Sequence, residues 1–255
     1  MDTEDPIQRP SLFLSLTEPV RAAADFATLL PGACALSQAP RGDGHRVIVL
    51  PGFTASDGST APLRSFLRNR GFDARGWKLG RNTAGPELRP GLLALLEQAV
   101  DESGGPVSLV GWSLGGVMAR NLARRTPELV RYLVTLGSPI NGRPDRTRAW
   151  QLYSRMNSDA ESRGRARRSG HRPPPEGVPC TAIYSRSDGV VPWQIARERA
   201  GDRRENVRVR ASHLGMGVHA GVLYAVADRL AQPRDEWRPF EAPWWLRGSM
   251  QGEPA

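Results

Sequence analysis

The chain has 255 residues, enough for one large domain that buries a full core without metal or disulfide crosslinks. Its 27 glycines and 22 prolines stay below the share found in low-complexity chains, which excludes collagen, a long coiled coil and disorder throughout. The formal net charge is +9, but Lys78 is the only lysine and most of the basic residues are scattered. A scattered charge favours solubility, so we expect no nucleic-acid partner.

The charge and hydropathy of the sequence bear on the cellular compartment of the protein. The start, Met1 to Asp5, is acidic where a secretory signal carries positive charge, and no apolar run has the length of a membrane span. We therefore expect a cytoplasmic protein. Cys34 and Cys180 form no metal-binding spacing; Cys180 is expected in the core, and a disulfide between the two is not favoured. No metal and no cofactor are expected.

The first predicted element is an apolar-rich helix over residues 11–30, ended by Pro31 and Gly32. After it, short apolar runs predict strands that are buried on both faces of a parallel sheet. These strands are 46–50, 107–110, 133–136, 181–184 and 207–209. Helical patterns fill the intervals at 60–70, 86–101, 115–126, 193–200 and 217–231. Alternating strands and helices indicate a doubly wound α/β sheet with helices on both faces.

Two segments interrupt this alternation. Residues 141–177 contain no clear strand, hold an arginine run and end in three prolines, which is typical of a functional insertion. In the tail, residues 233–255, prolines are interleaved with arginines and with Trp237, Trp244 and Trp245, and they predict an extended segment. We expect this tail to pack as a strap across the domain; contact with a membrane surface is the alternative, and it is not favoured. The oligomeric state stays open.

The sharpest local pattern is Gly111-Trp112-Ser113-Leu114-Gly115, which follows a predicted strand directly and precedes a predicted helix. A turn this tight imposes strained backbone angles on its central residue, while the flanking glycines let strand and helix approach closely. The Ser113 hydroxyl would then stand exposed at the carboxyl edge of the sheet. A serine in this position is a candidate nucleophile.

A serine hydroxyl requires a base, and the chain offers four histidines. His45 precedes the first strand and His171 lies in the insertion, so both are expected to be solvated. His219 falls within the last predicted helix, where a polar helix face would explain it. His213 follows a strand in a carboxyl-end loop, where open α/β sheets collect their ligand groups, and is the predicted base.

The carboxylate that orients the base is expected on another carboxyl-end loop. Asp188 follows the strand at 181–184, in Ser187-Asp188-Gly189-Val190-Val191-Pro192, and is the predicted acid. Weaker candidates lie in a charged turn, on an exposed helix and on the last helix: Asp202, Glu205, Glu198 and Asp228. Acyl transfer also needs N–H donors for the oxyanion, and we expect them from Leu114 and from Phe53, ahead of Thr54.

Four blocks of this sequence resemble the signature blocks of bacterial α/β-hydrolases of the lipase and esterase type. They are Leu50-Pro51-Gly52-Phe53, the elbow around Ser113, the loop of Asp188, and Ser212-His213-Leu214-Gly215, all within residues 46–231. The resemblance implies the order nucleophile, acid, base found here, a cofactor-free hydrolase and a lid at 141–177. Because only a helix precedes residues 46–50, it also implies a trimmed sheet of about six strands in a single domain, residues 1–255.

The expected function is a serine carboxylester hydrolase that forms an acyl-enzyme at Ser113 on small-molecule esters. The few large apolar residues of the insertion favour short- to medium-chain acyl groups. An acyltransferase or a thioesterase with the same three residues is the alternative. A binding protein that kept the fold but lost the chemistry is a third hypothesis.

Overall fold

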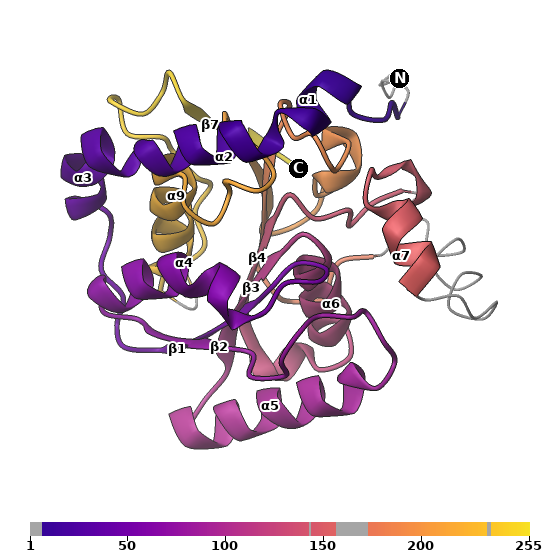
Figure 1. Ribbon diagram of the computed structural model, residues 1–255. Helices are drawn as coiled ribbons and strands as arrows, with labels where there is room; N and C mark the ends of the chain where they lie inside the picture. The colour runs from indigo at the N-terminus through magenta and orange to yellow at the C-terminus, as the bar shows by residue number, and fades with distance from the viewer. Residues whose placement is uncertain (1–6, 143, 157–172, 234–235) are drawn as a thin grey trace.

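The structure is a computed structural model that describes residues 7–142, 144–156, 173–233 and 236–255. Its helices and strands alternate along most of the chain (Figure 1). The helices are α1 Leu12–Leu16, α2 Glu18–Ala27, α3 Leu29–Ser37, α4 Asp57–Asn69, α5 Leu88–Ser103, α6 Leu114–Ala123, α7 Trp150–Met156 and α9 Ala220–Leu230, with short 3-10 turns η1 Pro127–Leu129, η2 Pro144–Arg146 and η3 Trp193–Ala196. The strands are β1 Arg46–Leu50, β2 Asp73–Gly76, β3 Val107–Trp112, β4 Val130–Leu136, β5 Cys180–Ser185, β6 Arg204–Val209 and β7 Met250–Pro254.

The described residues form one sheet of seven strands in the order β2-β1-β3-β4-β5-β6-β7. Strands β1 to β6 are parallel, and β7 is antiparallel to β6. This mostly parallel sheet between helices confirms the predicted fold class. The five strands predicted from apolar runs are all present. Two further strands, β2 and β7, occupy the edges, where half-solvated positions accept polar residues.

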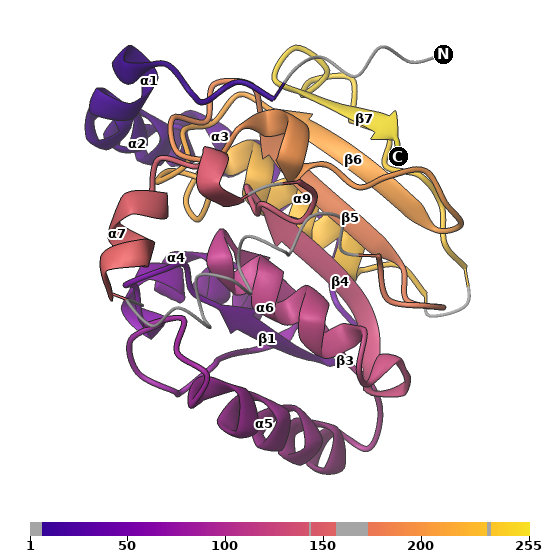
Figure 2. The same cartoon turned by 90° about the vertical axis from the view of Figure 1, so that its right-hand side faces the viewer.

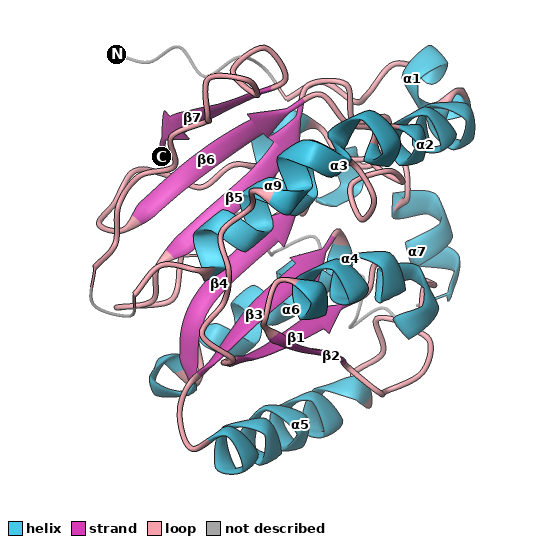
Figure 3. Cartoon of the chain, turned by 90° about the vertical axis from the view of Figure 1, so that its left-hand side faces the viewer, coloured by secondary structure: helices cyan, strands magenta, loops and turns pink. Residues whose placement is uncertain are grey.

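Helices cover both faces of the sheet, and alternate residues of each strand point to opposite faces. Val47 and Val49 of β1 pack in the core beneath α4 and α9, whereas Ile48 and Leu50 pack in the core beneath α5 and α6. Figure 3 shows α3, α4 and α9 on the near face, with α6 behind the strands and α5 below them. Each central strand is therefore buried on both faces, which explains its continuous apolar run.

The prediction of a single helix over residues 11–30 is wrong. Three short helices occupy residues 12–37, and α3 runs through Pro31 and Gly32. Pro31 is tolerated because it falls in the first turn of α3, where a backbone N–H has no helical partner. Figure 1 shows α1 to α3 running along one end of the molecule. The buried residues of α2 are Glu18 and Asp25, while its apolar residues Val20 and Phe26 are exposed.

The predicted insertion, residues 141–177, falls partly on residues 157–172, which lie outside the described residues together with its arginine run and His171. Its described part contains α7, which projects at one side of the sheet (Figure 2). The helix predicted at 193–200 is reduced to the 3-10 turn η3, residues 193–196. Pro192 immediately before it and extended backbone at Arg197 immediately after it limit its length.

The C-terminal tail packs on the sheet domain for part of its length. The ring of Trp237 lies against the core, and its Nε1–H donates to the hydroxyl of Tyr132 at 3.3 Å. Phe240 and Met250 are buried, as expected for a strap, and β7 extends the sheet. Trp244 departs from that expectation because it is 77% exposed. Strand β7 was not predicted because Met250–Pro254 contains no apolar run.

Cys180 is fully buried in the core, as predicted, and Cys34 is exposed; neither forms a disulfide. In the part of the chain that the structure describes, every helix is too short or too polar to cross a bilayer.

Candidate active site

Ser113 lies at the turn between β3 and α6, with φ 54° and ψ −120°. Such angles are costly for a residue with a side chain, on the order of 1–3 kcal/mol, and they persist only where the surroundings enforce them. The glycines beside it have no room for a side chain: a Cβ on Gly115 would lie 2.4 Å from the Leu50 carbonyl oxygen, and one on Gly111 would lie 2.3 Å from Gly116 Cα. The strand, turn and helix therefore have the predicted close packing.

Asp188 and His213 are joined by a hydrogen bond of 2.7 Å between Oδ2 and Nδ1, and both residues are buried. Asp188 Oδ1 accepts the backbone N–H groups of Val190 and Val191 at 2.8 and 2.7 Å. These two bonds fix the carboxylate and leave Oδ2 for the imidazole. Because a carboxylate only accepts, Nδ1 carries the proton, and the lone pair of His213 is on Nε2.

The charge environment of His213 raises its pKa above the ordinary value. Burial acts in the opposite direction, but the negative charge and hydrogen bond of Asp188 and the charge of Glu18 outweigh it. Loss of the proton from the imidazolium then occurs at higher pH than in a free histidine. A base with a raised pKa is also a stronger proton acceptor in its neutral form.

Two contacts bring Ser113 and the Asp188–His213 pair to the same end of β4. The Ser113 N–H donates to the carbonyl of Leu136 at 2.8 Å. The next residue, Gly137, has φ 52°, and a Cβ there would lie 3.0 Å from Asp188 Oδ2 and 3.1 Å from His213 Nδ1. Trp112 adds a direct link, because its Nε1–H donates to the His213 carbonyl at 3.1 Å.

The loop after β1, which the sequence predicts to carry an oxyanion donor, approaches Ser113. A Cβ on Gly52 would be 3.4 Å from Ser113 Cβ. The Thr54 N–H is already used, since it donates to the carbonyl of Asn82 at 2.8 Å. Among the described residues, the N–H groups of Phe53 and Leu114 have no acceptor. The two N–H groups that the sequence predicts as oxyanion donors, one in this loop and one at the start of α6, are thus free, whereas that of Thr54 is not.

Asn82 holds this loop and was missed by the sequence analysis. It is fully buried; its amide donates to the Pro51 carbonyl at 2.9 Å, and its own N–H donates to the Ala55 carbonyl at 2.8 Å. A polar residue in a connecting loop belongs to no apolar run. Its only signal was an asparagine between two helical patterns, which many solvated loops share.

The other histidines and acids lie elsewhere. His45 is not solvated as expected: it contacts Asp43 and Ser108 at the opposite, amino-terminal end of the strands. His219 caps the N-terminus of α9. Glu198 was expected on an exposed helix, but it is buried in an ion pair with Arg120, and Glu205 is buried in β6 with Arg229. Neither acid contacts His213.

The described part of the insertion packs against the loop after β1. The ring of Tyr153 in α7 lies 5.7 Å from that of Phe53, and Trp150 stacks on Tyr153 with centroids 5.4 Å apart. Leu152 and Met156 of the same helix are about half exposed. Aromatic and apolar side chains therefore border the site on the α7 side.

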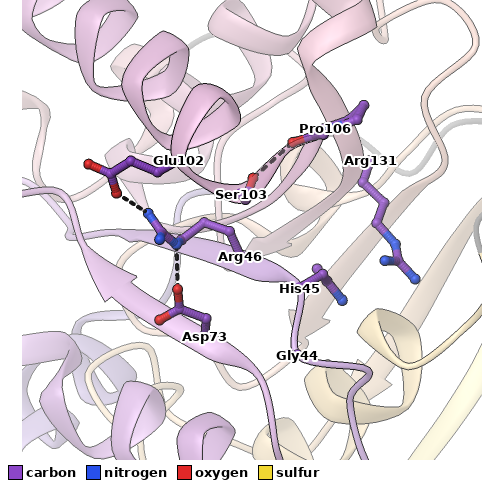
Figure 4. A pocket seen from close by; sticks show the side chains of 9 residues that line it. Gly44, His45, Arg46, Asp73, Glu102, Ser103, Pro106 and Arg131 are labelled. Atoms are coloured by element: carbon purple, nitrogen blue, oxygen red, sulfur yellow. Dashed lines mark hydrogen bonds and ion pairs between the residues drawn. The ribbon is translucent and has the colours of Figure 1, made fainter.

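A cavity of about 420 Å³ lies at the opposite end of the sheet (Figure 4). Arg46 crosses it and pairs with Asp73 at 2.6 Å and with Glu102 at 3.0 Å. Arg131 on the same wall pairs with Asp43. In these ion pairs the arginine charges are neutralised by carboxylates. The cavity is separated from Ser113 by the length of the strands. No group of three metal-binding side chains occurs among the described residues.

Comparison with known proteins agrees with this architecture. A search of curated proteins gave no match. The solved structures similar to this one include mouse alpha/beta hydrolase domain-containing protein 10 (18% identity, TM-score 0.54, 76% of this chain and 92% of that one). Another is MGS-MChE2, an alpha/beta hydrolase from a lagoon-sediment metagenome of Mar Chica, Morocco (18%, 0.53, 73% and 90%). A third is the pyrethroid hydrolase PytH (18%, 0.53, 75% and 99%).

These identities are low, and the structural likeness establishes the fold alone. Membership of a family is established by the sequence itself. The model of the alpha/beta hydrolase family matches residues 47–253, which span all seven strands of the described sheet. The chain belongs to the alpha/beta hydrolase family.

Proposed function

We propose that the protein is a serine carboxylester hydrolase that acts through Ser113, His213 and Asp188. The observation that carries the proposal is the buried 2.7 Å hydrogen bond between Asp188 and His213, two residues on loops that follow neighbouring strands. A buried carboxylate that fixes an imidazole in one tautomer is the arrangement required to activate a serine hydroxyl.

In the first half of the reaction, Ser113 Oγ attacks the ester carbonyl carbon while His213 Nε2 accepts the hydroxyl proton. The oxygen of the tetrahedral intermediate takes up the negative charge and accepts hydrogen bonds from the Phe53 and Leu114 N–H groups. Such preorganised donors contribute about 3–4 kcal/mol each to transition-state stabilisation in serine hydrolases. The intermediate then expels the alcohol, which takes the proton from His213, and leaves an acyl group on Ser113.

In the second half, His213 removes a proton from water as the water oxygen attacks the acyl carbon. Collapse of the second tetrahedral intermediate releases the acid and returns the proton to Ser113 Oγ. Asp188 stays ionised and stabilises the imidazolium formed in each half. The reaction closes without a metal or an organic cofactor.

The substrate preference that we propose is for short- to medium-chain acyl groups. The wall above the oxyanion loop is formed by the rings of Trp150 and Tyr153, which take up space next to Phe53. A panel of p-nitrophenyl esters from C2 to C16 tests this preference: we expect kcat/KM to be highest at or below about C8. A maximum at C16 would contradict it.

Hydrolysis is distinguished from acyl transfer by product analysis. With p-nitrophenyl butyrate and added methanol, a hydrolase releases butyric acid as its main product, whereas an acyltransferase releases mostly the methyl ester. Release of p-nitrophenol that requires Ser113 supports the proposal. Wild-type activity in Ser113→Ala would reject it.

A further inference from the structure

Helix α2 is oriented with its acids inward. Glu18 and Asp25 are seven residues apart, which is two helical turns, so they lie on one face, and both are buried. A buried carboxylate is unfavourable unless its lone pairs accept hydrogen bonds. The donors that these two receive come from the loops that carry Asp188 and His213.

The Asp188 loop is held on both sides of the acid. The Gly189 N–H donates to Glu18 Oε1 at 2.7 Å, and the Gly189 carbonyl accepts the Ser15 hydroxyl at 2.6 Å. The carbonyl of Ser187, on the other side, accepts Arg21 at 2.7 Å. Arg21 also pairs with Glu18 at 2.6 Å, so the N-terminal helices bind this loop as a connected network.

The His213 loop is held in the same way. The N–H groups of His213 and Leu214 donate to Glu18 at 3.1 and 2.9 Å. The N–H and hydroxyl of Ser212 donate to Asp25 at 2.7 and 2.5 Å. Glu18 therefore receives donors from both loops, and a single carboxylate sets the position of one loop relative to the other.

We propose that Glu18, assisted by Asp25, is a positioning residue of the active site that fixes the Asp188 loop against the His213 loop. The inference rests on the proposed function. Neither carboxylate touches Ser113, and each acts through the backbone of the residues it holds. Serine hydrolysis requires an imidazole placed within a fraction of an ångström, and a misplacement of about 1 Å costs on the order of 100-fold in rate.

The negative charge of Glu18 has a second consequence. The charged groups near His213 are Asp188 from the loop after β5 and Glu18 and Asp25 from α2, with Arg21 paired to Glu18. Glu18 contributes to the raised pKa of His213. Removing its charge while Arg21 remains lowers this pKa, so the acid limb of the rate profile moves to lower pH.

The test is Glu18→Gln, assayed with p-nitrophenyl butyrate across pH 5 to 9. We expect kcat to fall about 10- to 100-fold, since the side-chain amide cannot accept every backbone donor, with KM nearly unchanged. The acid limb of kcat/KM should move to lower pH. Glu18→Asp keeps the charge and shortens the side chain, so kcat should fall while the acid limb stays close to that of the wild type.

Two further variants separate positioning from folding. Glu205→Gln is the matched control, because Glu205 is equally buried and also accepts a backbone N–H, that of Phe240, away from the site. It should lower the melting temperature and leave kcat and the acid limb unchanged. Ser15→Ala removes the half-buried hydroxyl that donates to the carbonyls of Gly189 and Ser11, and should lower kcat a few-fold without moving the acid limb.

The inference is overturned if folded Glu18→Gln retains wild-type kcat and acid limb. It is also overturned if Glu18→Gln does not fold and Ser15→Ala retains the wild-type kcat, because the segment is then needed for folding alone. Failure of the proposed function is distinct: there Ser113→Ala stays active, whatever the Glu18 variants do.

Discussion

The N-terminal and C-terminal segments are both held to the sheet domain by hydrogen bonds to a buried glutamate, but the two glutamates hold different parts of the molecule. The N-terminal helices α1 to α3 carry Glu18 and bind the loops that hold Asp188 and His213. The C-terminal tail is bound by Glu205 of β6, which accepts the Phe240 N–H at 2.5 Å and pairs with Arg229 at 2.9 Å. The two glutamates are equally buried, both 2% exposed.

The difference lies in what each carboxylate holds. Glu18 holds loops whose relative position, under the proposed function, decides whether a proton transfer is productive. Glu205 holds a segment whose role is to cover apolar surface and extend the sheet with β7. Disturbing the N-terminal helices should therefore lower the rate of the reaction, whereas disturbing the C-terminal tail should lower the stability of the fold. Variants of the proposed catalytic residues show how large a loss of rate can be.

The largest effect is expected at the proposed nucleophile and base. Ser113→Ala and His213→Ala should each lower kcat by about 10⁴- to 10⁶-fold, and the double variant little further, because the groups act as one unit. Ester hydrolysis by variants whose circular dichroism matches the wild type measures this. An inactive His219→Ala beside an active His213→Ala would reassign the base.

A smaller loss is expected for Asp188→Asn, about 10³- to 10⁴-fold in kcat. The imidazole remains in place, but an amide that donates its N–H toward Nδ1 favours the unproductive tautomer. The loss in His213→Ala bounds the Glu18 variants, since a residue that acts through Asp188 and His213 cannot cost more than the loss of the base itself. A Glu18→Gln defect larger than that of His213→Ala would show that Glu18 has a role beyond positioning.

Deletion of residues 237–255 tests the expectation that the C-terminal tail stabilises the fold. The melting temperature should fall by several degrees or more, because each buried large side chain contributes about 1.5–3 kcal/mol and 1 kcal/mol corresponds to about 2–4 °C in a domain of this size. The kcat of the folded fraction should stay within about two-fold of the wild type.

The competing interpretation of the tail, an anchor in anionic lipid, predicts the opposite. It requires that the truncated protein keep its melting temperature and lose sedimentation with anionic vesicles. The exposed ring of Trp244 makes this control necessary. A stable truncated protein that no longer sediments with vesicles would overturn the strap.

The smallest effect concerns pH. Since the pKa of His213 is raised above that of a free histidine, the acid limb of kcat/KM should have its midpoint above pH 6.5, with activity rising as the imidazolium loses its proton. Tail variants should share this midpoint with the wild type. A wild-type midpoint below 6.5 would contradict the charge environment derived for His213.

The sequence was most informative where chemistry and local structure coincide. The elbow at Ser113 is local, because five consecutive residues contain the strand end, the glycines and the nucleophile. The central strands were predicted because burial on both faces leaves a continuous apolar run. Polar edge strands such as Asp73–Gly76 leave no such run, and β2 was missed for that reason.

Glu18 and Asp25 were missed for a different reason. Their partners on the two loops are 171 to 196 residues away along the chain, and nothing in a local window shows this. The apolar residues at helical spacing in residues 11–30 indicated a helix but not its orientation. In α2 the N–H donors of two loops require buried acceptors, so the face with the two acids is buried and the apolar face is exposed to solvent.

Covalent trapping of Ser113 tests the central claim most directly. The wild-type protein is incubated with a fluorophosphonate, and its intact mass is measured, followed by mapping of the modified peptide; Ser113→Ala and His213→Ala are treated identically. The account predicts one adduct per wild-type chain, on Ser113, no adduct in Ser113→Ala and slow labelling in His213→Ala. An unlabelled wild-type protein, or an adduct on another residue, would contradict it.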